Sequence, residues 1–112
     1  MRRVLFDENM PRKLRRDLPA FSIRTAQEEG WSAFRNGELL ARAAVQFDVF
    51  VTIDQRMRYQ QNMTRFNIGV VVIEVPDTRI VHLRALLSEL HDAIASVAPG
   101  EVILVKADRT SR

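Results

Sequence analysis

The chain of 112 residues has the length of one ordinary domain, and 46% of its residues are hydrophobic. We therefore expect a single domain over residues 1–112 whose core needs no metal or disulfide to fold. The absence of cysteine excludes disulfide scaffolds, thiolate zinc sites and cysteine nucleophiles, and it is typical of a cytoplasmic protein. No apolar run approaches the ~20 residues that cross a bilayer, and Asp7 and Glu8 interrupt the first one, so we expect neither a membrane partner nor a signal peptide.

The formal net charge is +3, and the basic residues are unevenly placed. All of them except Lys13 and Lys106 are arginines, whose guanidinium groups pair with phosphate oxygens through two parallel hydrogen bonds. Six basic residues fall within the first sixteen positions, namely Arg2, Arg3, Arg12, Lys13, Arg15 and Arg16. Three more arginines follow Asp54 closely. This distribution is compatible with a polyanionic partner.

The start of the chain predicts two strands and a helix. Residues 4–6 form a short apolar strand that stops at Asp7. Asn9 is a suitable N-cap for a helix over residues 10–18, because an asparagine side chain accepts a hydrogen bond from the first helical turn. Apolar and polar residues alternate over residues 21–25, which predicts a second strand with one solvent-facing side.

The middle of the chain predicts a helix followed by a buried strand. Asn36 is a second suitable N-cap, and apolar residues then recur at helical spacing as far as Phe47. Residues 49–53 are almost wholly apolar and β-branched, which indicates a third strand that stops at Asp54. The polar residues 55–66 predict a short helix and a loop.

The end of the chain predicts two more strands around one long helix. Residues 69–73 and 102–105 are apolar on both faces, which is typical of buried parallel strands. Residues 80–97 carry apolar side chains at helical spacing and predict a single helix. Strands that alternate with helices favour an α/β fold, a three-layer α/β/α sandwich around a mostly parallel sheet of about five strands.

Three acidic residues are expected at one edge of this sheet. Asp7 and Asp54 each follow a strand, and Glu38 falls in the first turn of the helix that begins at Asn36. Carboxylates that lie close together repel one another unless a cation offsets their charge, and Mg²⁺ prefers such oxygen ligands. Each acid alone is more typical of a turn or of a helix start than of a metal site, and only their expected position at one sheet edge makes the two interpretations equal.

A family resemblance rests on five segments, which are, in chain order, Asp7-Glu8-Asn9-Met10-Pro11, Glu28-Glu29-Gly30-Trp31, Asn36-Gly37-Glu38-Leu39-Leu40, Val51-Thr52-Ile53-Asp54-Gln55 and Tyr59-Gln60-Gln61-Asn62. Their order and spacing over nearly the whole chain resemble the compact PIN-like domains, small bacterial proteins allied to VapC-type toxin nucleases. The resemblance implies a PIN-like fold and a metal-dependent endoribonuclease that uses Mg²⁺ or Mn²⁺. It also implies RNA as substrate, an antitoxin protein as a partner and pairing into a homodimer.

The resemblance also implies which residues form the site. Asp7 matches the acid after the first strand, and Asp54 matches the acid of the Thr-x-Asp segment. The family's aspartate at the start of the middle helix is Asn36 here, whose amide oxygen brings no charge, and Glu38 would act in its place. Asp7, Glu38 and Asp54 are therefore the expected catalytic residues, and these three and Asn36 the expected metal ligands. Glu8 is a reserve ligand, although its side chain would point away from Asp7 if the strand continued there.

The side chains expected to contact RNA are Arg12, Arg15, Arg16, Arg56, Gln60, Gln61 and Asn62. Arginines would contact the phosphate backbone, and the amides could contact unpaired bases or simply brace a loop. His82 and His91 lie nine positions apart on the predicted helix, on nearly opposite faces, so we expect no shared metal there.

Two other functions stay open at this point. Asn36 favours a PIN-like module without catalytic activity that binds RNA or a protein. A more remote alternative is a phosphoacceptor signalling domain, because Asp7, Glu8, Asp54 and Lys106 are arranged along the chain as such a domain requires. Against it, Val75-Pro76 stands where a serine or threonine would be expected.

Overall fold

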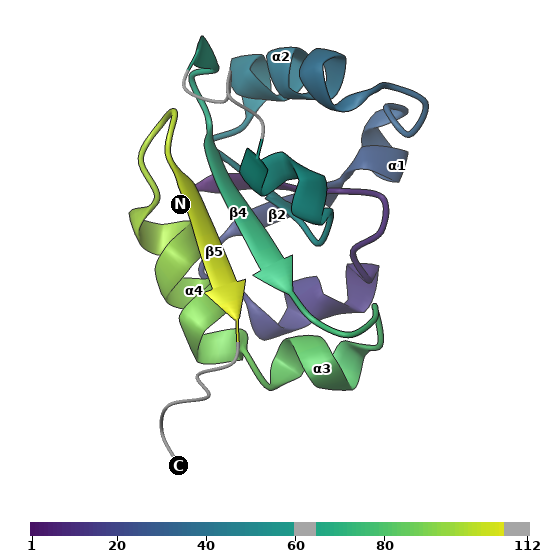
Figure 1. Ribbon diagram of the computed structural model, residues 1–112, viewed down its shortest axis with the longest axis vertical. Coiled ribbons are helices and arrows are strands. Elements are labelled where there is room, and N and C mark those ends of the chain that lie inside the picture. Colours follow the sequence, from purple (N-terminus) through teal and green to yellow (C-terminus); the bar gives the residue numbers. More distant parts are fainter. Residues whose placement is uncertain (60–64, 107–112) are drawn as a thin grey trace.

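The computed structural model of the protein describes residues 1–59 and 65–106. Five strands form one all-parallel sheet, with the spatial order β2-β1-β3-β4-β5 (Figure 1). The strands are β1 (Arg3–Phe6), β2 (Ser22–Thr25), β3 (Val49–Thr52), β4 (Gly69–Glu74) and β5 (Val102–Lys106). The expected α/β fold with a parallel sheet is confirmed.

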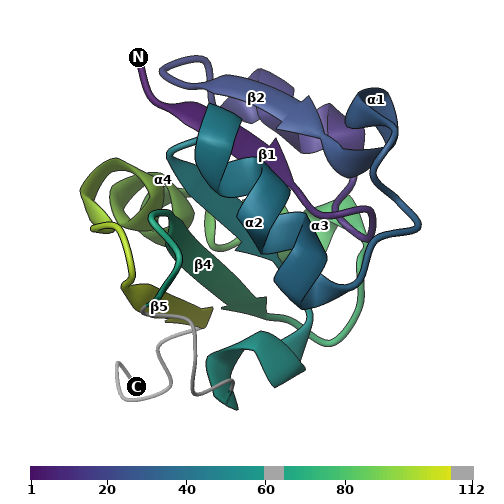
Figure 2. The same cartoon turned by 90° about the horizontal axis from the view of Figure 1, so that it is seen from above.

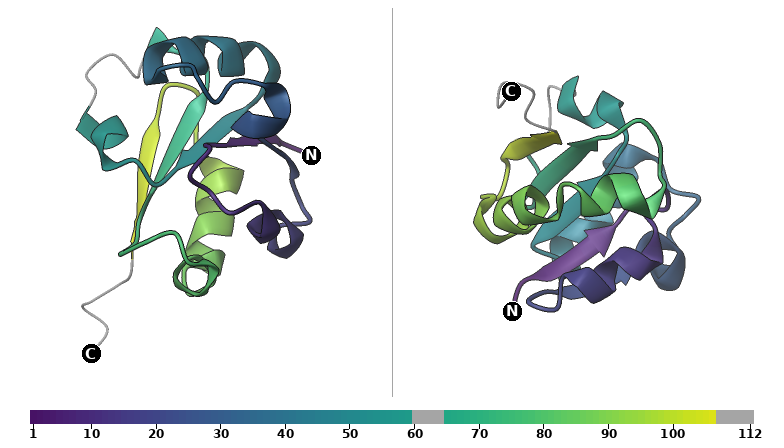
Figure 3. Two further views of the ribbon diagram at one scale, coloured as in Figure 1. Left: turned by 90° about the vertical axis from the view of Figure 1, so that its right-hand side faces the viewer. Right: turned by 90° about the horizontal axis from the view of Figure 1, so that it is seen from below.

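Helices cover both faces of the sheet. They are the 3₁₀ helices η1 (Arg12–Asp17) and η2 (Gln55–Tyr59) and the α-helices α1 (Ala26–Glu29), α2 (Asn36–Gln46), α3 (Ile80–Arg84) and α4 (Leu87–Ser96). Helix α2 lies across one face (Figure 2), whereas η1, α3 and α4 lie on the other (Figure 3). Within the described ranges, no helix is long and apolar enough to cross a bilayer.

Side chains that alternate along each strand form two halves of the hydrophobic core, one on each face of the sheet. In β1, Val4 and Phe6 pack toward α4 while Leu5 packs toward α2, and all three are fully buried. Strands β3 and β4 follow the same rule, because successive side chains of a strand point to opposite faces. Both faces of these central strands are buried, which explains why they read as continuous apolar runs.

The prediction of a single helix over residues 80–97 is wrong. The structure divides it at Leu86, whose backbone leaves the helical region at φ −109° and ψ 17°. Leu83 and Leu86 are both buried in the same half of the core. The break lets α3 pack beside η1 while α4 packs along β4 and β5, and one straight helix could not cover both places.

The two predicted N-caps are each displaced. Pro11, with extended backbone angles, precedes η1, so the helix begins later than expected and Asn9 lies outside it. Arg35 precedes α2 and its carbonyl oxygen accepts a hydrogen bond from the Leu39 amide at 2.7 Å, so Asn36 is the first residue within that helix.

The order of the strands fixes where a ligand can bind. From β1 the chain passes to β2 on one side and then returns to β3 on the other side. Loops that leave β1 and β3 therefore diverge at the carboxyl edge of the sheet. In open α/β sheets this divergence opens a crevice where ligands bind.

Candidate functional site

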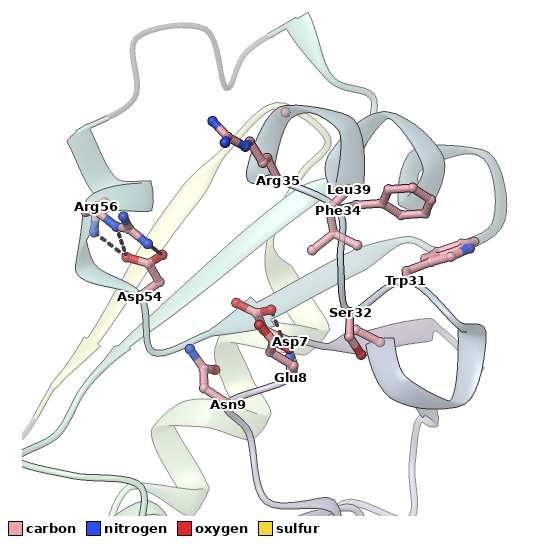
Figure 4. A pocket seen from close by; sticks show the side chains of 12 residues that line it. Asp7, Glu8, Asn9, Trp31, Ser32, Phe34, Arg35, Leu39, Asp54 and Arg56 are labelled. Atoms are coloured by element: carbon pink, nitrogen blue, oxygen red, sulfur yellow. Dashed lines mark hydrogen bonds and ion pairs between the residues drawn. The ribbon is translucent and has the colours of Figure 1, made fainter.

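A pocket of about 600 Å³ opens at the carboxyl ends of β1 and β3 (Figure 4). Three successive residues that follow β1 line it, and Asp54 and Arg56 line it from the segment after β3. The loop between α1 and α2 and the start of α2 complete the wall, with the side chains of Trp31, Ser32, Phe34, Arg35 and Leu39.

Asp7 is held in this pocket by two hydrogen bonds. Its side chain is nearly buried, and the Thr52 hydroxyl donates to Asp7 Oδ2 at 2.6 Å. The backbone amide of Glu8 donates to Asp7 Oδ1 at 2.8 Å. A carboxylate has about four lone-pair sites, so each oxygen of Asp7 keeps acceptor capacity for a ligand.

Thr52 joins the two acidic segments. The same hydroxyl that donates to Asp7 accepts a hydrogen bond from the Asp54 backbone amide at 3.0 Å. Thr52 is fully buried, and the Asp7 amide bonds the neighbouring Val51 carbonyl oxygen at 2.9 Å. The register of β1 on β3 therefore places Asp7 beside Thr52, and the buried hydroxyl fixes the orientation of both segments.

Asp54 forms a two-pronged ion pair with Arg56. Its Oδ1 accepts from the Arg56 backbone amide at 3.0 Å and from Arg56 Nε at 2.9 Å, and its Oδ2 accepts from an Arg56 Nη at 2.7 Å. These hydrogen bonds and the negative charge of Asp54 raise the pKa of Arg56 above its usual value. The Asp54 side chain is 15% exposed, whereas that of Arg56 is 83% exposed.

Asn9 contributes an amide oxygen without a partner. Among the side-chain nitrogen and oxygen atoms of residues 1–59 and 65–106, the Asn9 Oδ1 is buried and makes no hydrogen bond. Leaving a buried acceptor unsatisfied costs about 1–3 kcal/mol, so such an atom favours a ligand. The sequence indicated only a helix cap here, and the later start of η1 is what leaves Asn9 to line the pocket.

The structure does not bring Glu38 to these acids. Its carboxylate is 57% exposed and lies 3.8 Å from Arg42, and Glu38 does not line the pocket. Helical spacing gives the reason, because Glu38 shares a face of α2 with Arg42 and the exposed Val45, opposite the buried Leu40. Across the described ranges no three acidic, histidine or cysteine side chains form a group that could hold a metal.

Of the other two expected ligands, Glu8 lines the pocket, whereas the side chain of Asn36 is outside the described part of the chain. Asn36 is the first residue of α2 and precedes Gly37, which lines the pocket. Glu8 also lines it, because β1 ends at Phe6 and the strand alternation that would turn Glu8 away from Asp7 ends with it.

Three of the seven predicted RNA-binding side chains, those of Arg12, Arg15 and Arg16, lie outside the pocket. Of the four predicted arginines, Arg56 lines the pocket, and Arg35, which the sequence did not single out, lines it as well. Arg12 and Arg16 are exposed on η1, outside this pocket. Gln60, Gln61 and Asn62 lie outside the described residues.

Arg15 has a structural partner. Its two Nη atoms donate to the two oxygens of Glu28 at 2.9 Å each. Glu28 also completes a capping box with Thr25 at the start of α1. These contacts, with the Arg15 hydrogen bonds as the largest cause, lower the pKa of Glu28 to about 2. Arg15 therefore ties η1 to α1.

The donor set of the pocket fits a hard divalent cation. Asp7, Asp54 and Asn9 offer oxygen atoms, and Mg²⁺ is usually bound by one or two carboxylates together with water and substrate phosphates. The unsatisfied Oδ1 of Asn9 is the observation that favours such an ion over a purely structural role. Arg35 and Arg56 add positive charge at the rim, as a phosphate-bearing ligand would need.

The fold and the site together define the class: a doubly wound, all-parallel α/β protein with an acidic pocket at the point where its strand order reverses. No family model matches the chain, and no curated protein or solved structure matches it significantly.

Proposed function

We propose that the protein is a Mg²⁺- or Mn²⁺-dependent endoribonuclease of the PIN-like type. The observation that carries this proposal is the arrangement of Asp7, Thr52 and Asp54, in which one buried hydroxyl bonds the Asp7 carboxylate and the Asp54 backbone amide at the switch point of the sheet. The Asn9 Oδ1, which is buried and makes no hydrogen bond among the described residues, is a third oxygen that an ion at this pocket could take as a partner.

Some side chains of the pocket would bind the cation, and others would bind the RNA. Asp7, Asp54 and the Asn9 amide would hold the ion, and a divalent ion bound there supplies Lewis-acid activation of water and of the phosphate. Thr52 and the Glu8 amide keep Asp7 oriented. Arg35 and Arg56 would contact the RNA phosphate, whereas the rings of Trp31 and Phe34 pack against Phe47 and Arg42, respectively.

A role as the toxin of a toxin–antitoxin pair, an antitoxin partner and a homodimer stay predictions from the resemblance, and a cytoplasmic location stays a prediction from the absence of cysteine. None of the pocket geometry depends on them. The module without catalytic activity is favoured by the position of Glu38, because its absence from the pocket leaves fewer carboxylates than the resemblance implies.

The phosphoacceptor alternative is favoured by the strand order. The order 2-1-3-4-5 is also that of the doubly wound signalling domains, and Asp54 follows β3 as their phosphorylated aspartate does. Incubation with acetyl phosphate followed by mass measurement distinguishes a phosphoacceptor domain from a nuclease. A phosphorylated Asp54 would favour signalling, and an unmodified protein that cleaves RNA would favour the nuclease.

RNA cleavage tests the proposed function directly. The purified chain is incubated with a mixed single-stranded RNA and Mn²⁺, beside Asp7→Asn, Asp54→Asn and the matched control Asp77→Asn, whose carboxylate is 45% exposed and outside the pocket. We expect cleavage by the wild type and Asp77→Asn, its loss in the two pocket variants, and its loss with EDTA. Cleavage that survives both pocket substitutions, or a folded wild type that cleaves nothing, would overturn the proposal.

A further inference from the structure

The guanidinium of Arg56 covers the oxygens of Asp54 that a cation would need. Both Asp54 oxygens accept from the Arg56 side chain, at 2.9 Å and 2.7 Å. Both residues line the pocket that also holds Asp7. A cation that binds at Asp54 must therefore compete with the Arg56 side chain.

The local geometry allows the guanidinium to leave without losing the carboxylate's position. The Arg56 backbone amide donates to Asp54 Oδ1 at 3.0 Å, and the Asp54 amide donates to Thr52. Neither bond involves the arginine side chain. Because that side chain is 83% exposed, its ion pair with Asp54 is weak and exchanges readily with solvent.

A guanidinium released from Asp54 at this rim is well placed for a phosphate oxygen. Phosphate is a natural second partner, since arginine forms the same two parallel hydrogen bonds with phosphate as with carboxylate. Cation binding at Asp54 would thus release Arg56 for phosphate, and phosphate binding at Arg56 would remove the Arg56 guanidinium as a competitor of the cation at Asp54.

We propose that Arg56 is an exchangeable side chain that couples the two ligands of the pocket, so that a divalent cation and an RNA phosphate each raise the affinity for the other. The inference rests on the proposed function and adds its regulation. In the protein without ligand, Arg56 neutralises Asp54. In the doubly liganded protein, the cation takes that place and Arg56 pairs with phosphate. Linkage requires the coupling factor to be the same in both directions.

The chain contains a matched control for this arrangement. Asp77 and Arg79 repeat it, with the Arg79 amide on Asp77 Oδ1 at 3.0 Å and Arg79 Nε at 3.3 Å and 3.2 Å from the two oxygens. Asp77 lies before α3, outside the pocket. Arg79→Gln thus removes an ion pair of the same spacing, more exposed at its carboxylate and also in contact with His82, without touching the site.

The test measures Mn²⁺ affinity by electron paramagnetic resonance at low salt, with and without a nuclease-resistant phosphorothioate octauridylate. For the wild type and Arg79→Gln, the oligonucleotide should raise Mn²⁺ affinity about five-fold or more. In Arg56→Gln, Mn²⁺ alone should bind about two- to five-fold more tightly than in the wild type, because the competing charge is gone. The oligonucleotide should then add less than it adds in the wild type.

The possible outcomes distinguish a failure of the role of Arg56 from a failure of the proposed nuclease function. Equal Mn²⁺ affinity and equal coupling in the wild type and Arg56→Gln would overturn the role of Arg56 and leave the nuclease proposal standing. No Mn²⁺ binding by either protein, both folded by circular dichroism, would overturn both proposals.

Discussion

The Thr52 hydroxyl donates a 2.6 Å hydrogen bond to Asp7 across 45 positions of sequence, and the same oxygen accepts from the Asp54 amide. The bond is buried and joins adjacent parallel strands at their carboxyl ends. It brings together two acidic segments that are far apart in the chain, and it fixes the Asp7 carboxylate and the Asp54 backbone before any ligand arrives. Preorganisation of this kind is what a binding site on rigid elements requires.

Replacing Thr52 by valine, which has nearly the same shape, should disturb both stability and binding. The substitution leaves Asp7 Oδ2 and the Asp54 amide without the hydroxyl, and unsatisfied buried groups cost about 1–3 kcal/mol. We expect Thr52→Val to lower the free energy of urea unfolding by that amount and to weaken Mn²⁺ binding. Thr52→Ser keeps the hydroxyl and should retain most of both. Equal Mn²⁺ affinity in the two variants would contradict the orienting role.

Asn9 should behave as a ligand and not as a structural residue. Its Oδ1 makes no hydrogen bond among the described residues, so Asn9→Ala removes an unsatisfied acceptor and should leave the unfolding free energy within about 1 kcal/mol of the wild type. Mn²⁺ affinity should fall by about ten-fold, as is typical when a residue that supports a metal site is lost. Asn9→Asp should raise it. A strongly destabilised Asn9→Ala with unchanged Mn²⁺ affinity would show a structural role instead.

The ion pair between Arg15 and Glu28 makes stability depend on acid pH. The pKa of Glu28 is about 2 in the folded protein against 4.5 as its ordinary value. Its contribution is therefore complete above pH 4.5 and is lost as the pH falls toward 2. Both side chains are partly exposed, so after screening by solvent we expect about 1 kcal/mol. Urea unfolding at pH 3 and pH 7 should show a smaller difference for Glu28→Gln than for the wild type and for Glu38→Gln.

Two glycines should respond oppositely to alanine. A Cβ at Gly69 would lie 2.6 Å and 2.9 Å from the methyl carbons of Val97, so Gly69→Ala should cost about 1–3 kcal/mol by overpacking. A Cβ at Gly37 meets nothing within 4 Å, and helix α2 should gain about 0.5–1 kcal/mol from Gly37→Ala. Thermal unfolding of both variants gives the two signs. A stabilised Gly69→Ala would contradict the contact between β4 and the end of α4.

The strands of the sheet could be predicted because burial on both faces leaves its mark on neighbouring residues of each strand. Residues buried on both faces of a parallel strand must be apolar in succession, and the segments around Val51 and Val71 show that directly. Asp7 and Asp54 could be placed at one edge of the sheet because each directly follows an apolar strand, and the carboxyl ends of parallel strands lie at the same edge. The position of Glu38 was also available in principle, since the helical period sets it opposite Leu40.

Other features of the site depend on tertiary contacts that sequence spacing does not specify. The break at Leu86 arises because α3 and α4 pack on different elements. Asn9 becomes an unsatisfied acceptor because η1 begins only after Pro11. Arg35 reaches the pocket through the path of the loop before α2, and no motif marks it. Each of these positions is set by how whole elements meet.

The most direct test of the central claim locates a bound cation by its effect on nuclear spins. Amide signals of ¹⁵N-labelled protein are followed while Mn²⁺, which broadens nearby resonances, is titrated first to well below one equivalent and then to millimolar concentration. We expect broadening to centre on the amides of Asp7, Glu8, Asn9 and Asp54, and signals at the start of β1 and in the second half of α4 to stay sharp. Broadening centred elsewhere, or none at millimolar Mn²⁺, would contradict a cation site at the ends of β1 and β3.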